Sequence, residues 1–474
     1  MTSPYRSRVL PGWYDPATAA HSLLADHPRS FWLDAGSSAT AGWSYLGYGR
    51  LLIEVRDRGT RVRVSGADAA DAEYPVAAGG AHARVEELLA QYELPAAEVP
   101  GFGGGWVGLL GYEYGASLVG VAPAPGPGDL PEAAWLRSER MLAFDHAARR
   151  VTLIERAGLP RDERWECGGT DRDAPPPPAP IASPEDAPPL SVSWRHSDAH
   201  YRDLVRGCIA AIGHGEAYQI CLTNMATIPG RFDPRDLFRR LRALSPSHHA
   251  GLLILDGAAL VSASPETFLS ADGRGRVATR PIKGTRRRAR GDAAEDRRLA
   301  AELLADEKER AENLMIVDLC RNDLTRVAAP GTVSVSELFT VESYAQVHQL
   351  VSTVEARLAP ETGLGELIAA IFPAGSMTGA PKHRAMTLLA EYEEGPRGAY
   401  AGAFGYRDSR GTLSLAMVIR SIVCGPDLAR IGAGGGITAL SDPGRELAES
   451  HLKAAALLSV LRDSAAAGRT GPDK

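Results

Sequence analysis

The chain has 474 residues, 44% of them hydrophobic and 23% charged, which is the composition of a globular protein. Its 52 lysines and arginines against 58 acidic residues give a net charge of −6, without the basic surplus that indicates nucleic-acid binding. No apolar run reaches the roughly 18 residues of a membrane-spanning helix, and the first residues lack a signal-peptide core. Five scattered cysteines without CxxC spacing favour a reduced, cytoplasmic protein without a zinc site.

The first part of the chain alternates short apolar runs with Gly/Pro turns. The runs at 51–55, 61–64 and 151–154 predict strands, and 83–92 predicts a helix. The glycine-rich stretch 101–108 lacks the GK[ST] ending of a phosphate loop and a convincing helix after it. We therefore interpret its glycines as places where strands and aromatic side chains pack closely.

A proline-rich segment at 174–190 predicts an extended linker. We place an N-terminal domain at 1–173, a catalytic domain at 191–462 and a frayed tail at 463–474. The second domain mixes strands and helices without regular alternation, which indicates an α+β fold. Its predicted strands are 218–223, 252–255, 259–262, 413–419 and 429–432, and its predicted helices are 200–214, 296–324, 363–371, 381–392 and 445–461.

Lys283 lies in the stretch Arg280–Arg288, which we interpret as a turn entered through Pro281. Gly284 allows the backbone to approach a ligand closely. An apolar turn can remove hydration from a lysine, which lowers its pKa and produces a nucleophilic amine. A solvated lysine in a basic run is the alternative, because three arginines follow at 286–288.

Two pairs of glutamates occupy separate predicted helices. Glu309 and Glu312 share one helix face, and Glu446 and Glu449 form a stripe with Lys453 on the last helix. Carboxylates from two helices can hold Mg²⁺, although two solvated faces remain the simpler alternative. Three further stretches contain polar clusters or Gly/Ser turns: 321–323, 432–437 and 372–382. Such stretches can bind anions, so they favour a Mg²⁺-assisted enzyme that acts on a small polyanion.

From about residue 191 to 462 the chain resembles the chorismate-utilising enzymes. Several long motifs occur in the family's order, and the N-terminal half resembles its less regular domain more weakly. The matching stretches are Ser264–Glu266, Pro281–Arg286, Glu309–Asp323, His348–Thr353, Gly375–Lys382, Gly434–Ile437 and Ser441–Pro443.

The resemblance implies an anthranilate-synthase-like fold, with two facing antiparallel sheets and helices packed outside. It implies Mg²⁺ held mainly by Glu312 and Glu449, with Glu309 and Glu446 close by. It also implies a chorismate site. Arg420 and Tyr400 match residues that hold a carboxylate, Gly434 and Gly435 match backbone donors, His348 matches a histidine near the C4 hydroxyl, Thr378 lies in a ligand-facing turn and Lys453 lies beside the metal helix.

Two positions indicate the branch of the family. Water-adding relatives carry a lysine base where this chain has Gln219, and an amide cannot deprotonate water. Lys283 is the residue that aminodeoxychorismate synthase component I has in this motif, where anthranilate synthases have alanine. The chain most resembles that branch. A relative giving anthranilate or aminodeoxyisochorismate, or a non-catalytic binding subunit with the same fold, remains an alternative.

The resemblance implies a covalent mechanism. Lys283 attacks C2 of chorismate as the C4 hydroxyl leaves, with Glu266 as general acid and base and His348 assisting. Ammonia then adds at C4 and expels the lysine, which gives 4-amino-4-deoxychorismate, a precursor of p-aminobenzoate and folate. No cysteine lies in a Gly-x-Cys-x-Gly turn, so we expect ammonia from a separate glutamine amidotransferase subunit.

Overall fold

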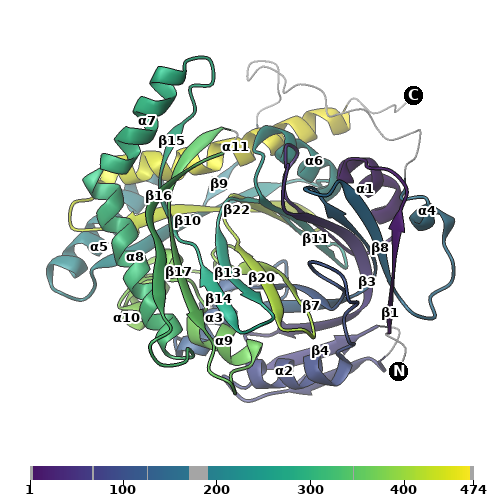
Figure 1. Cartoon of the computed structure of the whole chain (residues 1–474). Helices are drawn as coiled ribbons and strands as arrows, with labels where there is room; N and C mark the ends of the chain where they lie inside the picture. Colours follow the sequence, from purple (N-terminus) through teal and green to yellow (C-terminus); the bar gives the residue numbers. More distant parts are fainter. Residues whose placement is uncertain are drawn as a thin grey trace.

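Two layers of antiparallel strands face each other, and helices cover their outer surfaces (Figure 1). The computed structural model describes residues 4–66, 69–124, 126, 128–169, 190–344 and 346–469. Within these residues, no helix combines the length and the apolar character that crossing a bilayer requires. Cys208, Cys221, Cys320 and Cys424 are free thiols.

The first layer ends at the strand pair that carries the glycine motif at 432–437. Its strands are β1 (Tyr5–Leu10), β8 (Arg150–Arg156), β2 (Arg29–Asp34), β11 (His249–Leu255), β12 (Ala258–Ser264), β21 (Ser421–Cys424), β22 (Leu428–Ile437), β10 (Gln219–Pro229), β9 (Ser193–Trp194) and β18 (Gly379–Ala380).

The second layer ends at the strands that carry Lys283 and His348. Its strands are β5 (Ala72–Pro75), β4 (Arg61–Ser65), β6 (Trp106–Leu110), β19 (Ala403–Arg407), β20 (Thr412–Met417), β13 (Thr267–Asp272), β14 (Arg276–Thr279), β17 (Val347–Arg357), β15 (Ile282–Arg287) and β16 (Ser334–Ser343).

Two long strands belong to both layers. β3 (Trp43–Arg56) pairs with β2 through its first half and with β4 through its second half. β7 (Ala133–Asp145) likewise pairs with β6 and then with β8. The β3–β7 register shifts between Tyr48 and Leu52, where the paired strands pass from one layer to the other.

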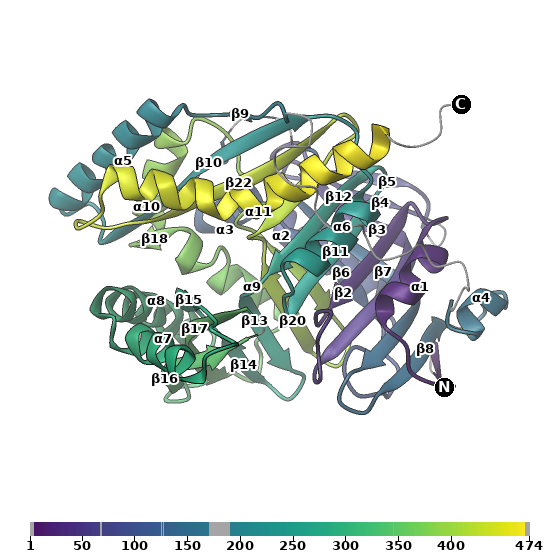
Figure 2. The ribbon, with the colours of Figure 1, turned by 90° about the horizontal axis from the view of Figure 1, so that it is seen from above.

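The helices cover the outer surfaces and the ends of the layers. Figure 2 shows α11 running along β10 and β22, and Figure 1 shows α7 and α8 outside β15–β17. The helices are α1 (Pro16–Leu24), α2 (Ala81–Tyr92), α3 (Tyr112–Val119), α4 (Glu163–Glu166), α5 (Asp198–Gly213), α6 (Pro234–Leu244), α7 (Ala293–Ala305), α8 (Glu307–Thr325), α9 (Leu364–Ile371), α10 (Lys382–Tyr392) and α11 (Pro443–Arg469).

Buried apolar side chains of the described residues form four cores, and alternation along the strands separates three of them. Phe31, Leu109 and Phe404 lie in the core between the two layers. Trp32, the neighbour of Phe31, lies instead under α1 and α6, and Leu110, the neighbour of Leu109, lies in the core of the second layer with α2 and α9. The layered order explains why so many strands are buried on both faces, and it confirms the predicted two-sheet fold.

The predicted N-terminal and catalytic segments are interleaved. β11 of the later segment pairs with β2, and β19 pairs with β6, so both layers contain strands from both segments. Most of the predicted linker at 174–190 lies outside the described residues. The glycine-rich stretch 101–108 provides packing space as interpreted, since a Cβ on Gly105 would stand 2.6 Å from the carbonyl oxygen of Arg407. A short helix, α3, does follow it, contrary to expectation.

Three further expectations require correction. The predicted helix 296–324 is two helices, because Asp306 takes an extended conformation (ψ 108°) and caps α8 with its side chain. The stretch at 280–288 is not a turn: Lys283 belongs to β15, which contains a bulge. The tail predicted to begin at residue 463 is helical as far as Arg469.

Candidate active site

The candidate site lies where the two layers end, between β22 of the first layer and β15 of the second. Glu266 occupies the connection between β12 and β13 and is 7% exposed. Burial raises the pKa of its carboxyl to about 7, although the Lys283 ammonium, the Ile282 N–H and the Ser376 hydroxyl all act to lower it. The Ser376 hydroxyl lies 3.4 Å from Glu266 Oε1. A carboxyl of this pKa can give and take a proton near neutral pH.

Lys283 lies within electrostatic range of both Glu266 and Glu449. A bulge sets its position, because β15 pairs with β17 through Ile282 and again through Thr285, with a register shift between them. Gly284 supplies the bulge with a φ of +82°. The arrangement brings a primary amine and a protonatable acid together at one edge of a layer.

Asn313 holds the strand segment before Lys283. Its side-chain amide lies 3.5 Å from the Pro281 carbonyl oxygen, and its Oδ1 accepts a hydrogen bond of 2.6 Å from Ser352. Asn313 is fully buried in α8. It belongs to the motif 309–323, but nothing in the sequence pattern separated it from the glutamates, so its positioning role was missed.

The predicted metal ligands lie on α8 and α11 around one lysine. Burial disfavours the charge on Lys308, but the carboxylates of Glu312, Glu446, Glu449 and Glu309 outweigh this effect and raise its pKa. Lys308 Nζ lies 3.7 Å from Glu312 Oε1. Burial, together with Glu312, also raises the pKa of Glu309. Burial and Glu449 raise the pKa of Glu446, while Ser441 donates a 2.7 Å hydrogen bond to it.

These four carboxylates have the chemistry that Mg²⁺ prefers, and Lys308 stands among them as a positive charge. Their carboxylate oxygens are not gathered closely enough to form a complete ligand set around one point. Across the described residues, the one group of three or more His, Cys, Asp or Glu ligand atoms within 4.8 Å of each other lies elsewhere. Glu449 instead forms a 2.7 Å ion pair with Lys453.

One edge of β22 offers backbone groups to a ligand. β22 pairs with β10 along its length, but with β21 only at Ala429 and Arg430. The Leu428 oxygen accepts from Gly425 on the β21 side, so strand alternation places the amide and carbonyl of Gly434 on that same side. Lys453 Nζ already donates to the Gly434 oxygen at 2.7 Å. The Gly434 N–H is thus placed to bind a carboxylate.

The same alternation turns the Gly435 amide toward Leu222 of β10, so the expectation that Gly435 donates to a ligand is corrected. Its lack of a side chain matters for a different reason. A Cβ at this position would stand 3.2 Å from Glu446 Oε2 and 3.6 Å from Glu449 Oε1. Gly435 therefore leaves room for the carboxylates of α11.

Arg420 and Tyr400 lie together near Glu449. The Arg420 side chain is solvent-accessible, yet the surrounding protein desolvates it and lowers its pKa. Its guanidinium makes no hydrogen bond or ion pair with any other residue that the structure describes. The buried Tyr400 ring packs over Gly432, and burial raises the pKa of its hydroxyl. An unpaired guanidinium beside a tyrosine hydroxyl suits a carboxylate ligand.

Thr378 does not face an open space. It is fully buried, and its hydroxyl donates to the Ala374 carbonyl oxygen at 3.1 Å. The turn that contains it is fastened by Lys382, whose ammonium binds Asp323 of α8 at 2.7 Å and the Ile371 oxygen at 3.0 Å. In this geometry Thr378 supports the turn, and its contact with a ligand stays a prediction.

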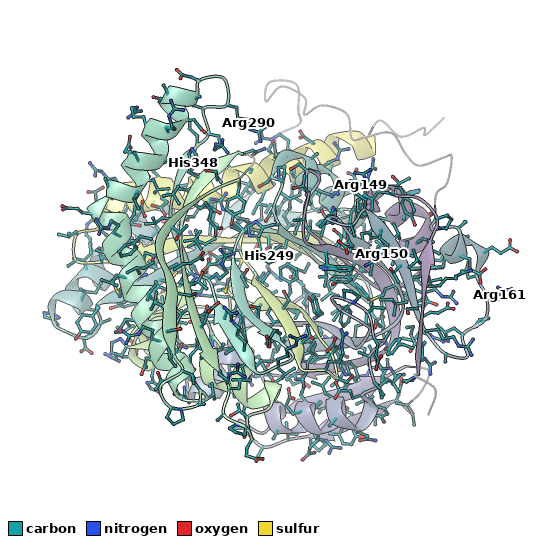
Figure 3. The ribbon with its side chains drawn as sticks, in the orientation of Figure 1. Arg149, Arg150, Arg161, His249, Arg290 and His348 are labelled. Carbon is teal, nitrogen blue, oxygen red and sulfur yellow. The ribbon has the colours of Figure 1, made fainter. Side chains whose placement is uncertain are left out.

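His348 requires a correction. Its Nδ1 lies 2.8 Å from the Ser343 hydroxyl, and its Nε2 lies 3.1 Å from Asp296 of α7. Figure 3 shows His348 beside α7, whereas His249 lies near the centre of the molecule. Nδ1 therefore joins β17 to β16 and Nε2 joins β17 to α7, and neither ring nitrogen is directed at Glu266. Alternation turns the next side chain, that of Gln349, to the opposite face of β17.

Gln219 begins β10 and is fully buried. Neither its amide nitrogen nor its amide oxygen has a hydrogen-bond partner among the described residues. Its amide nitrogen lies against Gly436 of β22. Sequence reasoning missed a buried group of polar side chains around Arg397. Its guanidinium binds Glu393 through two contacts of 2.7 Å and lies 4.2 Å from the centre of the Tyr112 ring.

Comparison with known proteins identifies the family. Residues 55–459 match the chorismate binding enzyme family, a range that includes every predicted site residue. The chain belongs to this family of chorismate binding enzymes. The match crosses both interleaved segments, in agreement with their shared layers.

Relatives of the chain include proteins named aminodeoxychorismate synthase and anthranilate synthase component 1. An aminodeoxychorismate synthase from Streptomyces pristinaespiralis is 42% identical over 97% of this chain, and the chain spans 65% of that relative's length. Anthranilate synthase component 1 from Streptomyces coelicolor is 37% identical over 98% of the chain and 90% of its own length. The crystal structure of anthranilate synthase component I from Streptococcus pneumoniae TIGR4 superimposes with a TM-score of 0.72 at 29% identity, covering 89% of this chain and 93% of that one.

Proposed function

We propose that this protein converts chorismate and ammonia to 4-amino-4-deoxychorismate. The observation that carries the proposal is Lys283, a primary amine held by the β15 bulge within electrostatic range of Glu266. An amine beside an acid with a pKa of about 7 is suited to covalent catalysis. Similarity to the Streptomyces pristinaespiralis aminodeoxychorismate synthase supports the same branch.

Substrate binding uses the end of the first layer. The Arg420 guanidinium, the Tyr400 hydroxyl and the Gly434 N–H bind chorismate carboxylates, because all three are donors without a protein acceptor among the described residues. Lys453 holds the Gly434 carbonyl and Glu449 in place at 2.7 Å each. Gln219 lines the site without acting as a base, since an amide cannot take a proton from water.

Catalysis proceeds in two displacements. The Lys283 amine forms a bond to C2 of chorismate, the two conjugated ring double bonds each shift by one position, and the C4 hydroxyl leaves as water after accepting a proton from Glu266. Ammonia then forms a bond to C4, both double bonds shift back, and the Lys283 amine leaves C2. Glu266 recovers its proton from the incoming ammonium group, so the balance is chorismate plus ammonia giving the amino product plus water.

Glu309, Glu312, Glu446 and Glu449 would hold a magnesium ion. Carboxylate oxygens are ligands that Mg²⁺ prefers. The ammonium group of Lys308 already lies within electrostatic range of all four carboxylates. A bound magnesium ion supplies positive charge that neutralises a carboxylate of the substrate. The chain's own part is to position these four side chains and to leave space above Gly435.

Ammonia is supplied by a glutamine amidotransferase partner. None of the five cysteines of this sequence has the Gly-x-Cys-x-Gly surroundings of a glutaminase nucleophile. The product is a precursor of p-aminobenzoate, and removal of pyruvate from it requires a separate lyase. We place the reaction in the cytoplasm.

A product assay tests the proposal. Purified protein is incubated with chorismate, Mg²⁺ and a high ammonium concentration, and products are read by mass and fluorescence with and without aminodeoxychorismate lyase. We expect a non-fluorescent amino product that gives p-aminobenzoate only when lyase is present. Lys283→Ala should lower the rate by at least about a hundredfold, while Arg287→Ala, an exposed neighbour on β15, should leave it unchanged.

Anthranilate synthase activity is the second candidate, because a relative of that name matches 98% of the chain. Fluorescent anthranilate formed without lyase, with full activity in Lys283→Ala, would favour that candidate and reject the first. An aminodeoxyisochorismate product would be distinguished by its conversion products. Removing Mg²⁺ with EDTA should abolish either activity, and adding Mg²⁺ back should restore it.

A further inference from the structure

A second group of potential metal ligands lies outside the candidate active site, where α5 begins and α10 ends. His196 and His200 are four residues apart, on either side of the cap residue Ser197, and Glu394 follows α10. One ligand atom from each lies within 4.8 Å of the other two. The scattered cysteines predicted no zinc site, but this group contains no cysteine.

A backbone contact fixes one ring nitrogen of His196. Its Nε2 lies 3.0 Å from the Glu393 carbonyl oxygen, which can only accept, so Nε2 carries the hydrogen and Nδ1 has a free lone pair. Metal-bound histidines are commonly oriented by this kind of contact. Asn224 fixes the backbone on both sides, accepting from the His196 N–H at 3.1 Å and donating to its oxygen at 2.9 Å.

The other two ligands are open to solvent. The side chains of His200 and Glu394 are 45% and 63% exposed, and His200 Nε2 lies 3.8 Å from Glu394 Oε1. Glu394 has a φ of +53°, the left-handed conformation that a glutamate rarely adopts. This conformation separates two neighbours, because Glu393 turns inward to Arg397 while Glu394 turns outward to His200.

We propose that His196, His200 and Glu394 bind a Zn²⁺ ion, with water as the fourth ligand. Two imidazole nitrogens and one carboxylate are ligands that Zn²⁺ takes in tetrahedral geometry. Mg²⁺ and Ca²⁺ prefer oxygen ligands alone, so the two histidines select against them. The bound ion joins the start of α5 to the segment 393–397, whose inner face supports Tyr400 through Arg397.

Isothermal titration of tag-free protein with ZnCl₂ tests this site. Excess Mg²⁺ is present so that the carboxylates of α8 and α11 do not compete. The parent protein should show a saturable Zn²⁺ site, and His200→Ala and Glu394→Gln should each weaken binding by more than about tenfold. His383→Ala, which removes an exposed histidine of α10 outside the group, should bind as the parent does.

Thermal unfolding provides a second readout that does not depend on catalysis. Zn²⁺ should raise the Tm of the parent and of His383→Ala, but not that of His200→Ala or Glu394→Gln. His200→Gln, which retains a polar side chain, replaces His200→Ala if circular dichroism shows loss of fold. Equal Zn²⁺ binding in all variants, or no saturable binding in the parent, overturns the proposal whatever the product assay gives.

Discussion

At the scale of single residues, the site depends on charges held where water is scarce. Glu266 is protonatable near neutral pH because burial outweighs the nearby Lys283. Lys308 is held among four carboxylates that it cannot neutralise fully. Arg420 holds a desolvated guanidinium that has no partner in the part of the chain that the structure describes. Each group is costly to the folded protein by itself, and each becomes useful when a polyanionic ligand or a cation completes its surroundings.

Glu266→Gln should change how stability depends on pH. The folded-state pKa of about 7 lies above the usual 4.5, so this group favours the folded state below pH 4.5 and loses that contribution as pH rises through 7. Because glutamine does not ionise, Glu266→Gln removes this decrease in unfolding free energy with rising pH. Compared with the parent, the variant should gain up to about 3 kcal/mol in unfolding free energy between pH 5 and pH 8.

Urea unfolding of both proteins at the two pH values measures this difference, with the exposed Glu361→Gln as the control. In the proposed reaction, the rate of amination should also fall about 10²- to 10⁴-fold in Glu266→Gln, because the C4 hydroxyl would lose its proposed proton donor. A parallel pH dependence in parent and variant would show that Glu266 is ionised in the folded protein at pH 5.

The sequence could predict which residues of the candidate site lie near one another, because motifs preserve spacing. The structure places Lys283 within electrostatic range of Glu266 and Glu449, and Lys308 within range of the four glutamates of α8 and α11, while the roles of these residues stay predictions. The faces on which side chains lie were harder to predict. His348 points to α7 and the Gly435 amide points to β10, and both follow from strand register, which depends on partners far away in the chain.

At the scale of elements, a bulge and a helix break position the chemistry. The bulge in β15 presents Lys283, and the break at Asp306 lets α8 begin beside that bulge. A Cβ on Gly284 would stand 2.8 Å from Leu303 and 3.1 Å from Glu309, so α7, α8 and β15 meet at this glycine. The periodic sequence from 296 to 324 gave no sign of the break, since Asp306 is compatible with a helix interior.

Gly284→Ala should damage both stability and activity. A positive φ costs an alanine about 1 to 2 kcal/mol, and the added methyl also displaces Leu303 or Glu309. Gly257→Ala is a matched control, because Gly257 has a φ of +96° but open space around its Cβ position. Chemical denaturation and the product assay compare the two variants.

Gly257→Ala should lose only the stability that a positive φ costs an alanine, and it should keep its amination rate. Gly284→Ala should lose more stability than Gly257→Ala, and its rate should fall because Lys283 is displaced. Equal destabilisation of the two variants, with full activity in both, would mean that the bulge does not position the lysine.

At the scale of the whole molecule, the two layers share β3 and β7 and enclose a common core. The proline-rich segment marks a division in the sequence, and composition alone could not reveal that strands from its two sides alternate in space. Pairing between β2 and β11, and between β6 and β19, joins residues more than about two hundred positions apart. Folding therefore requires both segments at once.

A fragment of residues 190–469 should not fold cooperatively. It would expose the edges of β11 and β19 and the apolar side chains between the layers, including Phe404 and Leu253. Near-ultraviolet circular dichroism and thermal unfolding should show no sharp transition, whereas co-expression with residues 1–169 should restore it. A fragment that unfolds sharply at the Tm of the full chain would show that the segments are independent.

The free edge of β22 has a consequence for the behaviour of the protein in a crowded cell. An unpaired strand edge ordinarily invites a strand from another molecule and so promotes aggregation. Here the edge beyond Arg430 lies in a buried part of β22, and Lys453 covers the carbonyl of Gly434. Among the described residues, this edge of β22 is therefore closed to a strand from a neighbouring polypeptide, while the Gly434 N–H keeps the position that we propose for a substrate carboxylate.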